Sequence, residues 1–304
     1  MSLYTFKRLN ECTLDEAVQA WNLGFAEYYV DLTMTTQRFI QRFVQDELSV
    51  DLSFIAMKND VPVGIVLNGV RNVAGRKVAW NGGTGVSVPY RGMGIGKVLI
   101  DQALKIYREE KVETATLEAI KANERAIGLY KSKGYELVDD LYQMSCDTPL
   151  SVLEDCAKSN SKELYTFRHG APHELRPYEE LMLWQAQWAN FRRDGEVLFA
   201  YDKESRVSGY ALYRIIFDAE GNEAGVSIGQ CRLMAESEDK RELLYALLSR
   251  IVRPERDGYR RMVLVLGSNA CLIEALRELG FQQTASQVYM IRTMEEMPQK
   301  ELIG

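Results

Sequence analysis

The stretch from Val86 to Lys97 constrains the fold more than any other part of this 304-residue chain. Its sequence, VSVPYRGMGIGK, alternates three glycines with Met93 and Ile95, after a β-branched run and a proline and before a helical pattern of apolar residues. Glycines let consecutive backbone N–H groups turn toward one point, and the first turn of a helix adds positive potential there. The stretch therefore predicts a strand, a phosphate-binding loop and a helix in succession.

Two common phosphate-binding motifs do not fit this spacing. A P-loop needs a glycine where Arg91 stands and a hydroxyl side chain where Val98 stands. A dinucleotide fingerprint needs a glycine where Lys97 stands. The pattern that does fit, Arg91-x-x-Gly94-x-Gly96, resembles the acyl-CoA pyrophosphate loop of the GNAT N-acyltransferase superfamily.

Hydrophobic periodicity predicts a strand, two helices and a three-strand meander before this loop. Thr35 and Thr36 are candidate N-caps, and Asn59-Asp60 is a candidate hairpin turn. The expected elements are a strand at 4–9, helices at 15–25 and 37–43, and strands at 52–58, 61–70 and 77–88.

A second motif follows a short predicted strand at 114–119. Asn123 is a good N-cap and Gly134 a good residue to end a helix, so one compact helix is expected between them. The N-x-x-A-x-x-x-Y-x-x-x-G-aromatic pattern from Asn123 to Tyr135 resembles the second GNAT signature. Two signatures in the right order identify the first half as a member of this superfamily.

The second half of the sequence repeats the first. The segment 54–64 aligns with 199–209 at an offset of 145 residues, and Asn123 and Gly134 match Asn269 and Gly280 at an offset of 146. A period this long indicates a duplicated domain. We therefore expect an α+β protein with two tandem GNAT-type domains, each a mixed, mostly antiparallel sheet flanked by helices. The expected boundaries are a catalytic domain at 1–148, a linker helix at 149–163 and a degenerate GNAT-like domain at 164–304.

The second copy lacks the glycine loop. At an offset of 146 residues, Ser237, Lys240 and Glu242 replace Arg91, Gly94 and Gly96, and Leu276 replaces Tyr130. Carboxylates near a helix N-terminus repel a pyrophosphate, and a stretch without glycine converges its amides less readily. The second copy is therefore predicted not to bind CoA.

Composition excludes several other classes of protein. A net charge of −6 gives no basic footprint for nucleic acid or for an anionic membrane. Five cysteines without a C-x-x-C pair argue against a disulfide framework and against a zinc site. His169 and His173 lack a third ligand, so no metal is expected. The first residues show no signal-peptide pattern and the chain has no long apolar run, which predicts a cytoplasmic protein. A homodimer is left open.

The resemblance implies that acetyl-CoA is the co-substrate and that the loop holds it. Backbone groups of Val86 and Val88 would bind the pantetheine arm and the acyl carbonyl, and backbone amides of the loop would bind the pyrophosphate. Asn123 is either a CoA contact or a plain N-cap, and Lys133 either neutralises a CoA phosphate or is solvated. The implied cofactor-binding residues are Val86, Ser87, Val88, Arg91, Gly92, Met93, Gly94, Ile95, Gly96, Lys97, Asn123, Tyr130 and Lys133.

The resemblance also assigns Tyr130 as the group that protonates the departing thiolate, although a core aromatic would occupy the same helix face. Some family members carry a glutamate on the strand before the V-x-V end, but the segment 80–85, WNGGTG, has no carboxylate. The base is therefore sought in Glu27, Asp31 or Glu118, and a water chain is the alternative.

The acceptor site is the least defined part of the sequence. Glycines at 82, 83 and 85 in mid-strand mark either a close approach of a ligand or a β-bulge. Tyr28, Tyr29, Trp80 and Asn81 are candidate acceptor contacts, or core residues. The implied activity is an N-acetyltransferase that moves an acetyl group to a primary amine of a small molecule or peptide in a ternary complex. The alternative is a non-catalytic acyl-CoA-binding sensor or scaffold.

Overall fold

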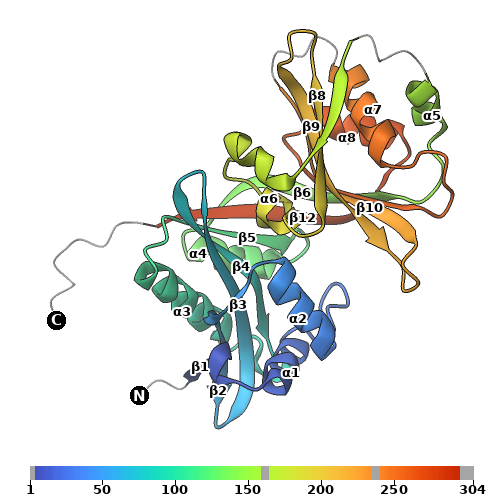
Figure 1. Ribbon diagram of the computed structural model, residues 1–304. Coiled ribbons are helices and arrows are strands. Elements are labelled where there is room, and N and C mark those ends of the chain that lie inside the picture. The colour runs from blue at the N-terminus through green and yellow to red at the C-terminus, as the bar shows by residue number, and fades with distance from the viewer. Residues whose placement is uncertain (1–3, 159–163, 235–239, 295–304) are drawn as a thin grey trace. The chain divides into compact units, whose positions relative to one another are not determined.

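The structure, a computed structural model, describes residues 4–158, 164–234 and 240–294 (Figure 1). The chain forms two compact units. One comprises the chain up to Val138 together with the segment that begins at Val288, and the other runs from Asp139 to Gln287. Each unit thus takes its last strand from the other half of the sequence.

The first unit is built on a mixed sheet with the strand order β1-β2-β3-β4-β5-β12. The neighbours β1 to β4 pair antiparallel, whereas β4 and β5 pair parallel. Its strands are β1 (Thr5–Arg8), β2 (Ser49–Lys58), β3 (Val61–Val73), β4 (Arg76–Val86), β5 (Thr114–Ile120) and the end of β12 (Gln282–Thr293). Its helices are η1 (Leu9–Glu11), α1 (Leu14–Gly24), α2 (Thr36–Gln45), η2 (Val88–Tyr90), α3 (Ile95–Glu109) and α4 (Glu124–Ser132).

Local sequence signals account for several of these boundaries. Asn59 and Asp60 both adopt positive φ, which is the requirement of the tight turn that joins β2 to β3. The Thr35 side chain accepts a hydrogen bond from the Arg38 amide and caps α2. Asn123 caps α4 in the same way. These predicted caps and the predicted hairpin turn are confirmed.

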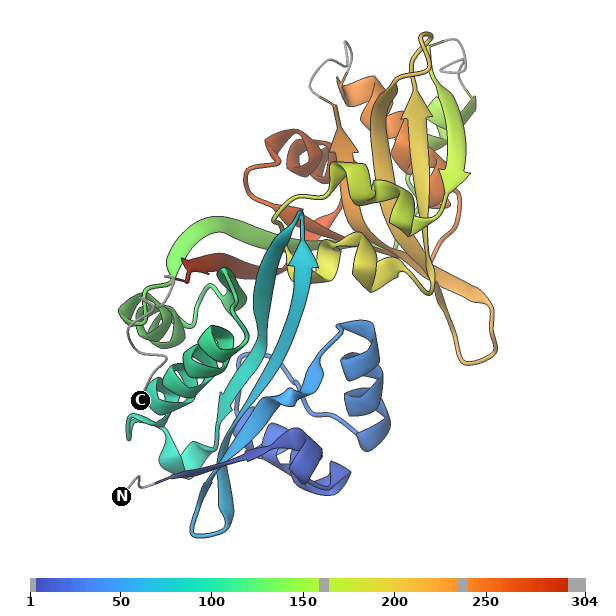
Figure 2. The ribbon, with the colours of Figure 1, turned by 60° about the vertical axis from the view of Figure 1, so that its left-hand side comes forward.

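Helices cover both faces of the first sheet. Figures 1 and 2 show α1 and α2 on one face and α3 and α4 on the other. The second face carries a core in which α3 and α4 pack on β2 to β5. Val288, Met290 and Met294, from β12 and the residue that follows it, are buried in this same core.

The second unit repeats the arrangement, with the strand order β6-β11-β10-β9-β8-β7. As in the first unit, three antiparallel pairs are followed by one parallel pair, β10 with β11. Its strands are β6 (Glu136–Cys146, shared with the first unit), β7 (Thr166–Gly170), β8 (Gly195–Tyr201), β9 (Val207–Phe217), β10 (Glu223–Leu233) and β11 (Arg260–Leu266). Its helices are α5 (Ser151–Lys158), η4 (Pro172–Tyr178), η5 (Trp184–Ala186), α6 (Trp188–Phe191), α7 (Lys240–Ile251) and α8 (Ala270–Glu278).

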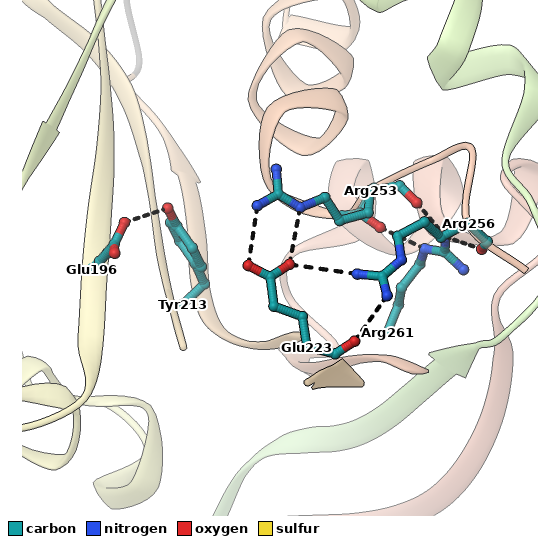
Figure 3. Close-up of polar contacts among 7 residues, drawn as sticks. Glu196, Tyr213, Glu223, Arg253, Arg256 and Arg261 are labelled. Atoms are coloured by element: carbon teal, nitrogen blue, oxygen red, sulfur yellow. Dashed lines mark hydrogen bonds and ion pairs between the residues drawn. The ribbon is translucent and has the colours of Figure 1, made fainter. Parts of the chain in front are cut away.

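A buried arginine holds the loop before β11. The Arg261 side chain donates hydrogen bonds to five backbone carbonyls, those of Thr148, Val252, Arg253, Arg256 and Tyr259. Beside it, Glu223 accepts from both Arg253 and Arg256 (Figure 3). Because Arg261 is fully buried, these carbonyls replace the water that its charge loses on folding.

The α+β fold class, with a mostly antiparallel sheet in each copy, is confirmed. The division into 1–148, 149–163 and 164–304 stays a prediction about domains, and the compact units take their boundaries at Val138 and Val288. Parts of that division, at 159–163, 235–239 and 295–304, lie outside the described residues, as does Ser237. Among the described helices, none combines the length and the apolar character needed to cross a membrane.

Candidate functional site

The glycine loop begins after η2 and ends at the first turn of α3. Gly92 and Gly94 have φ of 85° and 82°, a conformation that favours glycine. None of the amides of residues 92–96 has a well-formed hydrogen bond to an acceptor among the described residues. The first intrahelical donors are Lys97 and Val98, which both donate to the Gly94 carbonyl. The loop therefore presents several unpaired donors at a helix N-terminus, as an anion site requires.

The Arg91 guanidinium is directed away from this loop. Its Nε donates to the Val86 carbonyl at 2.9 Å, and its Nη2 donates to the Ala26 carbonyl at 2.5 Å and to the Gly24 carbonyl at 3.3 Å. The guanidinium therefore ties the end of β4 to the end of α1. Its proposed contact with the cofactor stays a prediction.

Two other cations border the loop. Lys97 is exposed in the first turn of α3. Arg125, in the first turn of α4, has its Nη2 only 3.5 Å from where a Cβ on Gly92 would lie. Sequence reasoning missed Arg125, although its position two residues after the Asn123 cap was a usable signal. Lys133, in contrast, donates to the Asp101 carboxylate at 2.5 Å.

Three further residues of the predicted cofactor site surround the loop. The Ser87 amide donates to the Val63 carbonyl, so this amide is engaged within the sheet. The Val88 amide has no acceptor among the residues described. The Met93 side chain is 62% exposed at the loop tip.

The strands β4 and β5 part just before this loop. Their parallel pairing ends at Asn81 and Leu117. At the same point the register between β3 and β4 shifts, so that Gly82 is the extra residue of a β-bulge. Beyond this point β4 and β5 are not paired, and we call this parting of the two strands the wedge. From there β4 runs on to Val86, just before the glycine loop.

The mid-strand glycines are explained by close packing. A Cβ on Gly83 would lie 2.9 Å from the Trp21 ring, and one on Gly85 would lie 2.9 Å from the Phe25 ring. Both rings belong to the α1 segment, which thus lies directly on β4. These glycines allow the helix to approach and do not by themselves indicate a ligand.

Glu118 lies on β5, one residue past the point where the strands part. Its Oε2 accepts a hydrogen bond from Trp80 Nε1 at 2.7 Å, and its Oε1 is buried without a partner among the described residues. Burial raises the pKa of Glu118 to about 7, against opposing hydrogen bonding from Trp80. A carboxyl group with this pKa can accept and release a proton near neutral pH.

Tyr130 lies on the inward face of α4, 8% exposed. Burial raises its pKa to about 12, and the Thr84 hydroxyl opposes this shift through hydrogen bonding. Thr84 belongs to β4, so the phenol lies near the strand that leads into the glycine loop. At neutral pH the hydroxyl keeps its proton.

Trp80 and Asn81 are interior residues at the bulge. The Trp80 side chain is 2% exposed and Asn81 is 4% exposed. The Asn81 amide donates to Thr84 Oγ1 and its Oδ1 accepts from the Gly83 amide, so both ends of this side chain brace the bulge. Their predicted contact with an acceptor stays a prediction.

The segment after α1 reaches the start of α4. Asn123 Nδ2 donates to the Tyr28 hydroxyl at 3.3 Å, and the Tyr29 hydroxyl donates to the Ala122 carbonyl at 3.3 Å. Glu27 is exposed, and hydrogen bonds from the Thr33 side chain and then from the Thr33 amide lower the pKa of Asp31. The structure thus brings Tyr28 and Asn123 together, while Glu27 and Asp31 are solvent-facing carboxylates.

Three residues near Glu118 were missed by sequence reasoning. Arg42 on α2, Asp46 at the C-cap of that helix and Tyr289 on β12 all interact electrostatically with Glu118. From the sequence alone, Arg42 and Asp46 could be recognised only as an i,i+4 ion pair of a helix. Tyr289 comes from the far end of the sequence, where no local pattern connects it to this site.

Metal-ligating side chains do not cluster in the described part of the chain: no group of three or more His, Cys, Asp or Glu is placed to hold a metal ion there. His169 instead contacts Glu196, its Nδ1 lying 3.3 Å from the carboxylate oxygen.

One family model matches part of the first unit. Residues 14–135 match the model described as the acetyltransferase (GNAT) family. No curated protein matches the sequence as a relative.

Solved structures match nearly the whole chain. A GCN5-related N-acetyltransferase from Sphaerobacter thermophilus is 12% identical, with a TM-score of 0.63, over 96% of this chain and 96% of that one. A tandem GNAT protein from the clavulanic acid biosynthesis pathway is 15% identical, with a TM-score of 0.62, over 97% and 99%. A putative acetyltransferase from Pyrococcus horikoshii is 16% identical, with a TM-score of 0.61, over 98% and 92%. At these identities the likeness concerns the fold.

Proposed function

We propose that the first unit is an acetyl-CoA-dependent N-acetyltransferase, because residues 14–135 match the GNAT acetyltransferase family model and the fold resembles that of a tandem GNAT protein. It would move an acetyl group to a primary amine of a small molecule or peptide, directly between two bound substrates. The observation that carries this proposal is the set of unpaired amides at residues 92–96, which follows β4, the strand that parts from β5 one residue before Glu118.

The loop fits the pyrophosphate of acetyl-CoA, which would supply the thioester. Unpaired backbone amides at a helix N-terminus can stabilise a bound anion even without a positively charged side chain. Lys97 and Arg125 flank these amides, and in the proposed complex they add the charge that a phosphate group needs. Arg91 would act indirectly, by holding the end of β4 against α1.

Glu118 is the proposed base. An alkylamine with a pKa of about 10.4 arrives at neutral pH as an ammonium ion and must lose a proton before it can attack. The unpartnered Oε1 offers an acceptor for an N–H of that ammonium, directly or through one water. With a pKa of about 7, the Glu118 carboxylate is about half ionised at neutral pH and can hold the proton that it removes.

Tyr130 is proposed to donate a hydrogen bond to the leaving sulfur. Its pKa of about 12 lies about 3.5 units above that of an ordinary thiol, so complete proton transfer to a thiolate would cost about 5 kcal/mol. A hydrogen bond needs no such transfer and still stabilises developing negative charge. Burial thus favours the role of hydrogen-bond donor over that of full general acid.

A thiol-release assay over a panel of amines, combined with calorimetric titration of acetyl-CoA, tests this function. We expect binding of acetyl-CoA and acceptor-dependent release of free thiol with at least one class of amine. Tight binding without release for every amine would favour the alternative of a sensor or scaffold. That alternative rests on the lack of a carboxylate on β4, whereas the adjacent β5 carries one in Glu118.

A further inference from the structure

Arg42 connects α2 to the bulge of β4. Its Nη2 donates to the carbonyl of Gly82, the extra residue of the bulge. Its Nε lies 3.3 Å from Asp46 Oδ2, one helical turn further along, and its guanidinium lies 4.6 Å from the centroid of the Trp21 ring. The side chain is largely buried, so these contacts take the place of solvent.

The bulge in turn supports the residue that holds Glu118. A Cβ on Gly82 would lie 2.7 Å from the Trp80 ring, so the indole rests against the bulge backbone. The same indole donates its N–H to Glu118 Oε2 at 2.7 Å. A continuous set of contacts therefore runs from Asp46 through Arg42, the bulge and Trp80 to the Glu118 carboxyl group.

The charges of the pair act on Glu118 in opposite directions. Asp46 is 7% exposed, and its negative charge raises the pKa of Glu118, while the positive charge of Arg42 lowers it. Trp80 on β4 contributes a neutral hydrogen bond, and the buried phenol of Tyr289 on β12 also interacts electrostatically with Glu118. The pair can therefore adjust the protonation of Glu118 while it fixes the bulge.

We propose that Arg42 and Asp46 form a positioning pair that holds the β4 bulge beneath Trp80 and so orients the Glu118 carboxylate toward the acceptor amine. The catalytic part of this inference rests on the proposed function, since it takes Glu118 as the base. The pair itself touches neither substrate in this scheme, because it acts through Gly82 and Trp80.

The test measures the titration of Glu118 directly in the full-length protein. Carbon-13 labelling of glutamate carboxyl groups gives an NMR signal for Glu118, assigned by its loss in Glu118→Gln. Titrations of Arg42→Gln and Asp46→Asn are compared with the wild type, and kcat/KM is measured over the same pH range. Arg71→Gln is the matched control, because Arg71 forms a 2.9 Å ion pair with Glu47 at the same end of α2, with similar burial.

Opposite shifts are expected from the two variants. Removal of Arg42 should raise the Glu118 midpoint by about one unit, and removal of Asp46 should lower it by about one unit, because each loses one charge that acts on the carboxylate. The acid limb of kcat/KM should follow the same two shifts. Arg71→Gln should leave the midpoint where it is.

Unchanged midpoints in both folded variants, or shifts of the same sign, would overturn the proposal, as would an equal shift in Arg71→Gln. If Arg42→Gln does not fold, as judged by circular dichroism, the direction in which Asp46→Asn shifts the Glu118 midpoint tests the proposal by itself. Midpoints that shift while the acid limb of kcat/KM does not would support the pair and reject Glu118 as the base, so the two proposals fail separately.

Discussion

The two units share the geometry of a wedge and differ in what lines it. In the first unit β4 and β5 part after Asn81 and Leu117, next to a bulge at Gly82. In the second unit the pairing of β10 with β11 ends at Ile228 and Val263, next to a bulge at Gly229. The bulge and the parting of the strands are therefore properties of the duplicated fold, independent of catalysis.

The side chains in the two wedges differ where chemistry would occur. At an offset of 146 residues, Leu264 stands in place of Glu118 and Leu276 in place of Tyr130. The second wedge holds a cavity of about 330 Å³, and its mixed lining includes Leu264 and Leu272 together with charged side chains such as Arg232 and Lys240. The comparison teaches that this fold keeps its opening when the carboxylate and the phenol are gone, so function depends on a few residues placed in a retained frame.

The largest expected effect comes from breaking the exchange of strands. A chain that ends at Gln287 loses the segment that supplies Val288, Met290 and Met294 to the first core. Burial of each such side chain contributes about 1.5–3 kcal/mol, and a domain is stable by only about 5–15 kcal/mol. We expect complete loss of acetyltransferase activity and of cooperative unfolding of the first unit, measured by thiol release and thermal denaturation.

The matched control ends at Met294. It removes the rest of the tail but keeps the three buried side chains, so it should retain activity. If the shorter chain remained active as well, the first unit would not depend on β12.

The next largest effect is expected from replacing Glu118, the residue whose counterpart in the second unit is Leu264. Glu118→Gln keeps the volume of the side chain and removes its ability to accept a proton, so kcat/KM should fall by about 10²–10⁴-fold. In the wild type, kcat/KM should rise with pH up to about 7, where the carboxyl group loses its proton, and this rise should vanish in the variant. Initial rates of thiol release between pH 5.5 and 8.5 test both points. An affinity for acetyl-CoA that fell in parallel would instead make Glu118 a structural residue.

A third prediction concerns the glycine loop and its counterpart. Gly94→Glu places a carboxylate among the unpaired amides and forces a residue with a Cβ to adopt φ near 82°, so acetyl-CoA affinity should fall by about 100-fold or more. Lys240→Glu is the control, because Lys240 occupies the equivalent position in the second unit. Calorimetric titration of both variants makes the comparison. Weaker binding in Lys240→Glu would mean that the second unit also takes part in holding CoA.

Local patterns predicted much of the first unit, because caps, hairpin turns and amphipathic periods are encoded within a few residues. The turn at Asn59-Asp60, the cap at Thr35 and the helix between Asn123 and Gly134 all followed from such signals. The family resemblance predicted a mostly antiparallel sheet, and the duplication extended that prediction to the second copy. What it could not predict is that each sheet takes its last strand from the other half, since that depends on pairing between residues far apart in sequence.

The environment of the candidate site was less accessible for the same reason. Glu118 could be named as a carboxylate on a strand, but its contact with Trp80 depends on the register between β4 and β5. Arg91 matched the family motif, yet its guanidinium is directed to carbonyls of α1 and β4, which only the packing of that helix reveals. Charge and motif indicate which residues matter, and tertiary contacts decide what each of them can do.

The smallest expected effect concerns Tyr130 and its counterpart Leu276. Because the aliphatic Leu276 is fully buried in the second unit, the helix packs at this position without a hydroxyl group. Tyr130→Phe should therefore fold and bind acetyl-CoA normally while kcat falls by about 10-fold, the cost of one lost hydrogen bond of about 1.4 kcal/mol. Tyr135→Phe is the matched control, since its ring is also buried and lies 6.0 Å from that of Tyr130, but its hydroxyl has no assigned role. Stopped-time thiol release gives kcat, and calorimetry gives the affinity. Equal losses of kcat in both variants, or loss of acetyl-CoA binding in Tyr130→Phe, would show that the Tyr130 phenol stabilises the core. The difference between Tyr130 on α4 and Leu276 on α8 would then be one of packing alone.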